Sequence, residues 1–203
     1  MKRRDFLLTS STGLAFAATG ALAETAMKPL SPMQWTDENG LTRFLKTDTD
    51  PLNGEFEKYP RCPSCGMMRQ MFSHSRHLIV YGNDTVDGTC SLHCAAISLS
   101  LNMDQGPVKI YAGDAGAEGD MKPLGDALAM TYVVDPDKMG TMTAVSKFAF
   151  TDAEKAKAAA GPNAKLVTFD EALTMAYVDM AKDTIAIRKR RGEKRAAAKK
   201  AAQ

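Results

Sequence analysis

The sequence predicts an α+β protein made of two small related ββαβ units packed together, with an extended N-terminal lead-in and a basic C-terminal tail. Short strand-like runs alternate with helical patterns in both halves of the chain, and turn-forming residues separate them. Beyond Ile187 the apolar pattern gives way to charge. With 203 residues and 44% apolar content, the chain can bury one ordinary core or two small ones.

The first unit is expected at about residues 61–115. His77–Tyr81 (HLIVY) is a strand candidate, which the turn-forming run GNDTVDG closes. Helical spacing extends from Ser91 to Asn102, and Val108–Ala112 (VKIYA) is the next strand candidate. This unit has the order strand, strand, helix, strand if the run just before His77 is also extended.

The second unit is expected at about residues 125–187, with two strands, a capped helix, a short strand and a longer helix. In order these are Met130–Val134, Ala144–Phe150, the run AEKAKAAA after the cap Thr151-Asp152, Lys165–Thr168, and a helix that begins at Phe169. The last helix carries a stripe near helical spacing, typical of a core-facing helix: Ala172, Met175, Ala176, Met180 and Ile185.

Charge divides the chain into an acidic body and a basic tail. Residues 24–187 hold 15 basic and 22 acidic side chains, whereas residues 188–203 hold eight basic and one acidic. The acidic body argues against binding of nucleic acid. The tail is predicted to be either a solvated end or a peripheral contact with anionic lipid headgroups or an acidic partner.

Residues 1–23 resemble an export signal. A basic start precedes a moderately apolar stretch, and Ala21-Leu22-Ala23 gives the small-x-small pattern that precedes cleavage. The paired arginines in KRRDFLL match the twin-arginine pattern, which predicts export to the periplasm. Residues 24–60 show little periodicity and are interpreted as the extended lead-in.

Four cysteines and three histidines, all that the chain has, lie between Cys62 and Cys94. Cys62 and Cys65 form a Cys-Pro-x-Cys pair. Cys90, His93 and Cys94 stand at i, i+3 and i+4 and would share one face at the start of a helix. The cysteines of this second group could be small buried hydrophobic residues, but two sulfur clusters so close together favour metal or redox chemistry.

Three chemistries compete for these residues. Zinc could take Cys62, Cys65, Cys94 and either Cys90 or His93. The Cys62–Cys65 pair would also suit thiol-disulfide exchange, although Gly66 and a methionine-rich run follow it where such pairs usually open a helix.

The methionines favour Cu(I), because this soft ion accepts thiolate, thioether and imidazole ligands together, whereas zinc seldom takes a thioether. Met67, Met68 and Met71 follow Cys65, and His74 and His77 come next. Met139 and Met142 stand farther along the chain, in a turn region. Some of the chain's methionines must be ordinary core residues.

Four segments together resemble the NosL family, the accessory proteins of nitrous oxide reductase: CPSCGMM, DGTCSLHCAA, KMGTMTAVSKFAF and LVTFDEA. The resemblance spans roughly residues 60–175. It implies an exported Cu(I)-binding protein with two related ββαβ units, which supplies copper to the reductase. It favours Cys65, Met67 and Met139 as ligands, with Cys62, His93 and Cys94 next, and the spacing argument adds Cys90.

The sequence therefore predicts a periplasmic Cu(I) metallochaperone, not an enzyme, with its copper-binding domain at residues 61–187. Its expected partners are a client copper enzyme, with nitrous oxide reductase the first candidate, and a copper donor. A thiol-disulfide reductase acting on a copper apoprotein and a zinc-stabilised scaffold are the alternatives. Many members of the family are lipoproteins, and this chain has no cysteine near its expected cleavage point.

Overall fold

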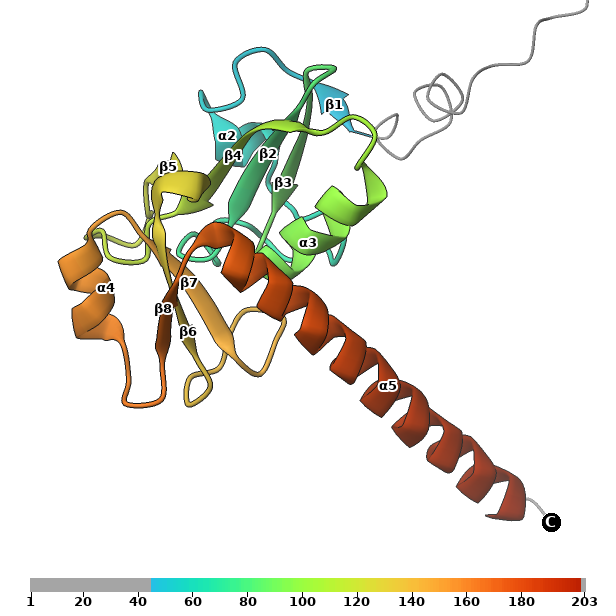
Figure 1. Cartoon of the computed structure of the whole chain (residues 1–203). Helices are drawn as coiled ribbons and strands as arrows, with labels where there is room; N and C mark the ends of the chain where they lie inside the picture. The colour runs from blue at the N-terminus through green and yellow to red at the C-terminus, as the bar shows by residue number, and fades with distance from the viewer. Residues whose placement is uncertain (1–44, 202–203) are drawn as a thin grey trace, which may run out of the picture. The chain divides into compact units, whose positions relative to one another are not determined.

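The computed structural model describes residues 45–201, which form a mixed α/β structure with two antiparallel sheets (Figure 1). The elements in chain order are β1 (Lys46–Thr47), α2 (Glu55–Lys58), β2 (His77–Tyr81), β3 (Thr85–Thr89), α3 (Leu92–Leu101), β4 (Pro107–Gly113), β5 (Leu124–Asp126), η2 (Ala127–Ala129), β6 (Thr131–Asp135), β7 (Ser146–Phe150), α4 (Ala153–Ala159), β8 (Lys165–Val167) and α5 (Phe169–Ala201). The expected signal segment and the first part of the lead-in lie outside the described residues. Within residues 45–201, no helix combines the length and apolar character needed to cross a membrane.

The first sheet has five strands in the order β1-β3-β2-β4-β5. Its central strand β2 pairs His77 with Thr89 of β3 and with Ala112 of β4. The strand predicted at His77–Tyr81 is confirmed. The helix predicted from Ser91 is also confirmed, because Ser91 is the N-cap of α3 and its Oγ accepts the Cys94 N–H.

The second strand of this sheet is not where the sequence placed it. Residues 70–75, just before β2, are turns, and β3 overlaps the run GNDTVDG that was expected to be a turn. All residues of β3 are buried, but Asp87 and Gly88 do not give the apolar pattern from which a strand is predicted. Gly88 leaves room for its neighbours, since a Cβ there would lie 2.8 Å from Tyr59 Cβ and 2.9 Å from Arg69 Cζ.

The second sheet has three strands in the order β7-β6-β8, and Tyr132 of β6 pairs with Ala149 and with Val167. The cap predicted for α4 is confirmed, because Asp152 accepts the N–H groups of Glu154 at 2.8 Å and Lys155 at 3.3 Å. In each sheet the chain runs through two strands, a helix and a third strand, and the first of those strands lies between the other two.

Part of the expected lead-in belongs to the folded body. Residues 45–60 contain β1 and the short helix α2 in place of an extended chain. Glu55 and Tyr59 are buried there, and β1 pairs with the edge of β3. The charged residues and prolines of this segment gave no pattern from which these contacts could be predicted.

The two sheets share one core with the start of α5. This core contains Ile79 and Ile110 from the first sheet, Tyr132 from the second, and Phe169 and Ala172 from α5. Hydrogen bonds also join the sheets, from the Ala115 N–H to the Ala149 carbonyl at 2.8 Å and between His77 Nε2 and the Tyr132 hydroxyl at 3.1 Å.

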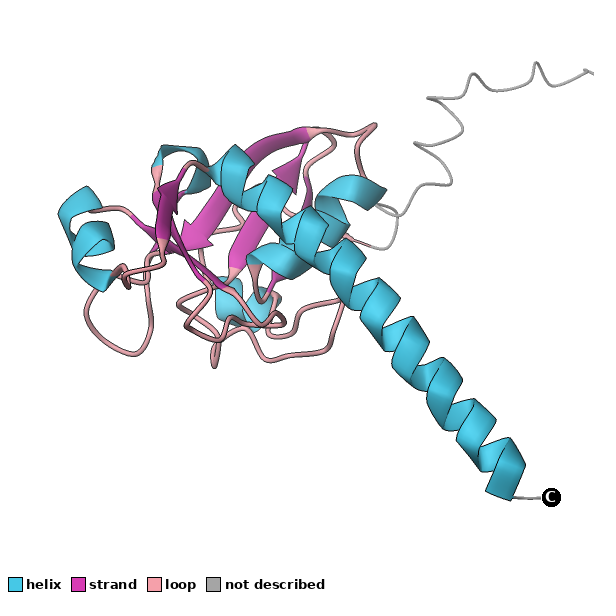
Figure 2. Ribbon diagram, turned by 60° about the horizontal axis from the view of Figure 1, so that its bottom comes forward, coloured by secondary structure: helices cyan, strands magenta, loops and turns pink. Residues whose placement is uncertain are grey.

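The helix α5 packs on the core only over its first turns (Figures 1 and 2). The predicted stripe holds as far as Met180, whereas Ile185 is 64% exposed. Beyond that point the side chains are exposed, and the basic segment continues as helix to Ala201.

Candidate metal centre

The loop from Cys62 to Met67 presents the first pair of cysteines. The Cys62 N–H donates to the Met67 carbonyl at 2.9 Å, and the Gly66 N–H donates to the Cys62 carbonyl at 2.8 Å. Gly66 has φ +77°, a left-handed conformation that disfavours any residue with a side chain. This tight turn brings the thiols of Cys62 and Cys65 to one side of the loop.

The second pair lies where β3 gives way to α3. Cys90 precedes the N-cap Ser91 and Cys94 lies in the first turn, so Cys90 is outside the helix that the sequence placed it on. Because the chain changes direction between them, their Sγ atoms approach to 3.8 Å.

All four sulfur atoms meet in one cluster. The Sγ atoms of Cys62, Cys65, Cys90 and Cys94 lie within 4.8 Å of one another, and those of Cys65 and Cys90 are 3.3 Å apart. A metal held tetrahedrally by thiolates at about 2.3 Å separates its sulfur ligands by roughly 3.8 Å. The four free thiols therefore have the spacing of a metal site. Cys65 is half-buried and the other three are buried.

Hydrogen bonds within the cluster give its thiols different pKa values. Thiol donation from Cys90 and Cys94 lowers the pKa of Cys62 well below its usual range. The neighbouring Cys62 raises the pKa of Cys90 and of Cys94 above theirs. The cluster thus stabilises a thiolate on Cys62, and metal binding would release protons from the other thiols.

A buried charged network supports the loop that carries these cysteines. Arg69 is fully buried and donates to the Tyr59 carbonyl at 2.8 Å and to the Thr89 carbonyl at 3.3 Å, next to Cys90. Glu55 accepts from both Arg69 and Arg76, each through a buried ion pair. Sequence reasoning missed this network, because charged residues in a turn-rich segment give no signal of burial.

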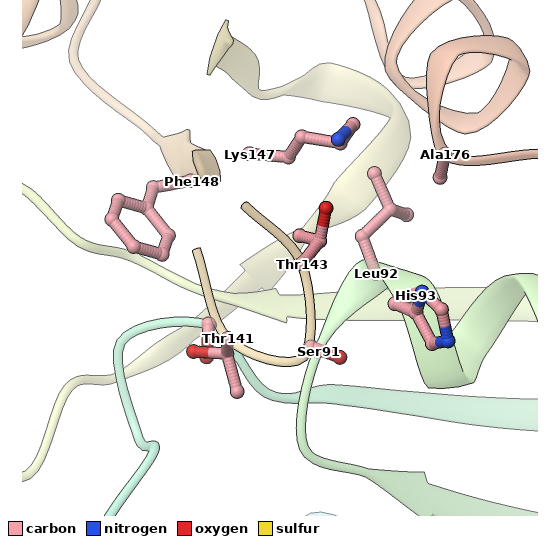
Figure 3. A pocket seen from close by; sticks show the side chains of 9 residues that line it. Ser91, Leu92, His93, Thr141, Thr143, Lys147, Phe148 and Ala176 are labelled. Atoms are coloured by element: carbon pink, nitrogen blue, oxygen red, sulfur yellow. The ribbon is translucent and has the colours of Figure 1, made fainter. Parts of the chain in front are cut away.

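The other predicted ligands lie at different distances from the cluster. Met67 is half-buried and packs against the thiols together with Phe72. His93 is not part of the thiol cluster; it lines a neighbouring pocket with Thr141, Thr143 and Lys147 (Figure 3). Burial lowers the pKa of His93, which favours the neutral imidazole.

Met139 is 84% exposed on the loop between β6 and β7. That loop is fastened beside the cluster, because the hydroxyls of Ser75 and Thr141 are 2.8 Å apart and Ser75 Oγ donates to the Cys90 carbonyl at 2.9 Å. Met142 on the same loop has φ +65° and is partly exposed. The fold therefore brings a methionine-bearing loop of the second sheet to the cysteines of the first.

Comparison with known proteins identifies a family model that matches the chain and a solved structure that resembles it. The family model described as NosL matches residues 53–196. The crystal structure of the copper chaperone NosL from Shewanella denitrificans is 22% identical, covers 55% of this chain and 87% of its own, and superimposes with a TM-score of 0.45. No curated protein matches.

Proposed function

Because this chain belongs to the NosL family, we propose that it is an exported Cu(I)-binding accessory protein that passes copper to a client enzyme and has no catalytic turnover of its own. The observation that carries the proposal is the convergence of four thiols within 4.8 Å, with the thioether of Met67 packed on them. A site of thiolates and a thioether suits a soft monovalent ion.

Transfer would proceed by ligand exchange. Cys65 is the least buried thiol of the cluster, so a ligand of the partner could reach copper on that side and form a shared intermediate. Met139 extends from the adjacent loop and is the proposed ligand that meets the ion or the partner at the surface. His93, which lines the neighbouring pocket, is the last of the proposed ligands.

The client that we propose from the family resemblance is nitrous oxide reductase, with a copper donor upstream. We also propose export by the twin-arginine route through residues 1–23, and a repeated ββαβ plan over residues 61–115 and 125–187.

The basic helical segment 188–201 would hold the protein at an anionic membrane surface. Deleting residues 188–203 should then abolish binding to vesicles containing anionic lipid, and unchanged binding would contradict this attachment.

The copper proposal is tested by anaerobic titration of the reduced protein with Cu(I) against a competing chelator. Cys65→Ser and Met67→Leu should each weaken copper binding by about tenfold or more, because each removes a soft ligand. Met103→Leu is the matched control, since Met103 is 76% exposed and stands apart from the cluster. Failure to compete for copper, with reversible oxidation of Cys62 and Cys65 instead, would assign the protein to thiol-disulfide exchange.

A zinc-stabilised scaffold is the second candidate, because a four-thiol cluster with three buried members also fits a closed structural zinc site. Zinc would then contribute to folding itself, and its removal by a chelator should unfold the domain. The Met67→Leu variant separates the two candidates, since a zinc scaffold should keep its metal affinity in this variant while a copper carrier loses it.

A further inference from the structure

A hollow outside the cysteine cluster gathers a second group of soft ligands. Met71 and His74 line it from the turns before β2, and Met121 lines it from the segment before β5. The two methionine side chains are 71% and 43% exposed, so they are not core residues. These residues are about 50 positions apart in sequence and meet only in the folded chain.

Hydrogen bonds hold the two segments together. Ser73 is buried, its Oγ donates to the Asp120 carbonyl at 2.6 Å, and the Lys122 N–H donates to the same Oγ at 3.4 Å. The Ser73 carbonyl in turn accepts from Arg76 Nη1 at 2.6 Å. The contact between the segments is therefore a built feature of the fold.

The imidazole in this hollow has a fixed environment. The His74 ring is half-buried and meets the Phe148 ring edge to face, with ring centroids 5.1 Å apart. The nearby ammonium group of Lys122 donates to the Ala117 carbonyl at 2.6 Å, and Asp120 adds a carboxylate to the lining. The contact with Phe148 orients the His74 ring.

We propose that Met71, His74 and Met121 form a second, weaker site for Cu(I), separate from the four cysteines. Two thioethers and an imidazole are soft or borderline ligands that suit Cu(I) better than zinc or magnesium. None of them is anionic, so the site should bind Cu(I) more weakly than the thiolate cluster does. None of them can form a disulfide, so the site would persist in an oxidising compartment.

This inference deepens the proposed function, because it gives copper a place to bind on its way to or from the cysteines. The same short loop serves both sites: Phe72 packs against the cysteine cluster, while Met71 and His74 on either side of it line the hollow. A weaker surface site next to a tighter inner site would let copper move inward by ligand exchange.

The test uses Ag(I), a redox-stable soft ion, added to the reduced protein labelled with ¹³C at its methionine methyl groups. The first equivalent should bind the cysteine cluster. The second should shift the methyl signals of Met71 and Met121 and the ring signals of His74. Met71→Leu and Met121→Leu should each weaken the second binding event by about tenfold and leave the first unchanged, whereas Met103→Leu should change neither.

Three results would overturn the inference while leaving the proposed function standing. These are a missing second equivalent, a second equivalent that shifts only Met139 and Met142, and one that the two leucine variants do not weaken. Failure of the first equivalent to bind the cysteines would instead contradict the proposed function. The backbone amide spectrum of each variant shows that the fold is kept.

Discussion

The two helix starts that follow the sheets' second strands, α3 and α4, occupy the same place in the order of elements but carry different chemistry. In the first, Cys90 precedes the cap Ser91 and Cys94 follows in the first turn. In the second, Thr151 precedes the cap Asp152, and no sulfur is present. The topology needs only a polar cap at this position, so the two thiols at the start of α3 are additional to what this topology requires.

The two sheets also differ in the residues that pack beside them. Val133, Phe150 and Ala156 form an apolar cluster beside the second sheet. The first sheet has an apolar cluster of Tyr59, Leu78 and Val86. It also packs against Glu55, Arg69 and Arg76, which are buried and paired. Turns that carry cysteines offer little apolar surface, so the segment around the candidate metal centre is stabilised by charge pairing in addition to apolar packing.

Removing the Glu55 carboxylate, which pairs with both Arg69 and Arg76, should destabilise the protein the most. Glu55→Gln leaves Arg69 and Arg76 buried without a counter-charge, which should lower the free energy of unfolding by about 3–5 kcal/mol. Urea unfolding followed by circular dichroism measures the change.

The control lies on α4 of the second unit. Glu154→Gln removes an exposed pair with Lys157 and should change the free energy of unfolding by less than about 1 kcal/mol. Equal losses in the two variants would mean that the buried network contributes no more than a surface pair.

The pH dependence of stability should report on two buried titratable groups of the first sheet, His77 on β2 and Asp87 on β3. Burial lowers the pKa of His77 to about 4, so the unfolded chain binds a proton between pH 6.5 and 4 that the folded chain does not. This costs about 3 kcal/mol of stability on acidification. Burial raises the pKa of Asp87 to about 6, so the folded chain takes up its proton first and gains a similar amount between pH 6 and 3.8.

The two effects should nearly cancel in the wild type between pH 6 and 4. Asp87→Asn removes the compensation and should lose about 3 kcal/mol of stability over this interval, as measured by urea unfolding at stepped pH. His77→Gln should show the opposite slope. Parallel pH profiles for the two variants and the wild type would show that neither group titrates as its burial requires.

Strands and helices with regular apolar spacing were predictable from the sequence, and those with polar letters were not. His77–Tyr81 and the start of α5 at Phe169 follow from side-chain pattern alone. The strand β3 did not, because Asp87 and Gly88 are buried for reasons that lie far along the chain: Asp87 accepts from Ser98 Oγ at 2.6 Å, and Gly88 makes room for Arg69.

The cysteines of the candidate metal centre could be picked out from the sequence, but their geometry could not. Concentration of cysteine in one region identified the four thiols, yet only the folded chain shows that they converge and that His93 lines a different pocket. The approach of the β6–β7 loop depends on the pair Ser75 and Thr141, 66 residues apart, for which no local pattern exists. Long-range contacts of this kind leave no periodic trace in a sequence.

The N-cap residues of α3 and α4, Ser91 and Asp152, allow the two helix starts to be compared directly. Ser91→Ala and Asp152→Ala each remove a side-chain acceptor from the first turn of a helix, so each should lower the free energy of unfolding by about 1 kcal/mol. Only Ser91 also touches the candidate metal centre, since its Oγ accepts the Cys94 N–H and lies 3.8 Å from the Cys90 Sγ. Ser91→Ala should therefore weaken Cu(I) binding as well, by about tenfold, because the two thiols lose a group that orients them. If chelator competition shows equal copper affinity in both variants, the cap of α3 serves the helix alone, and the difference between the two helix starts resides entirely in the cysteines.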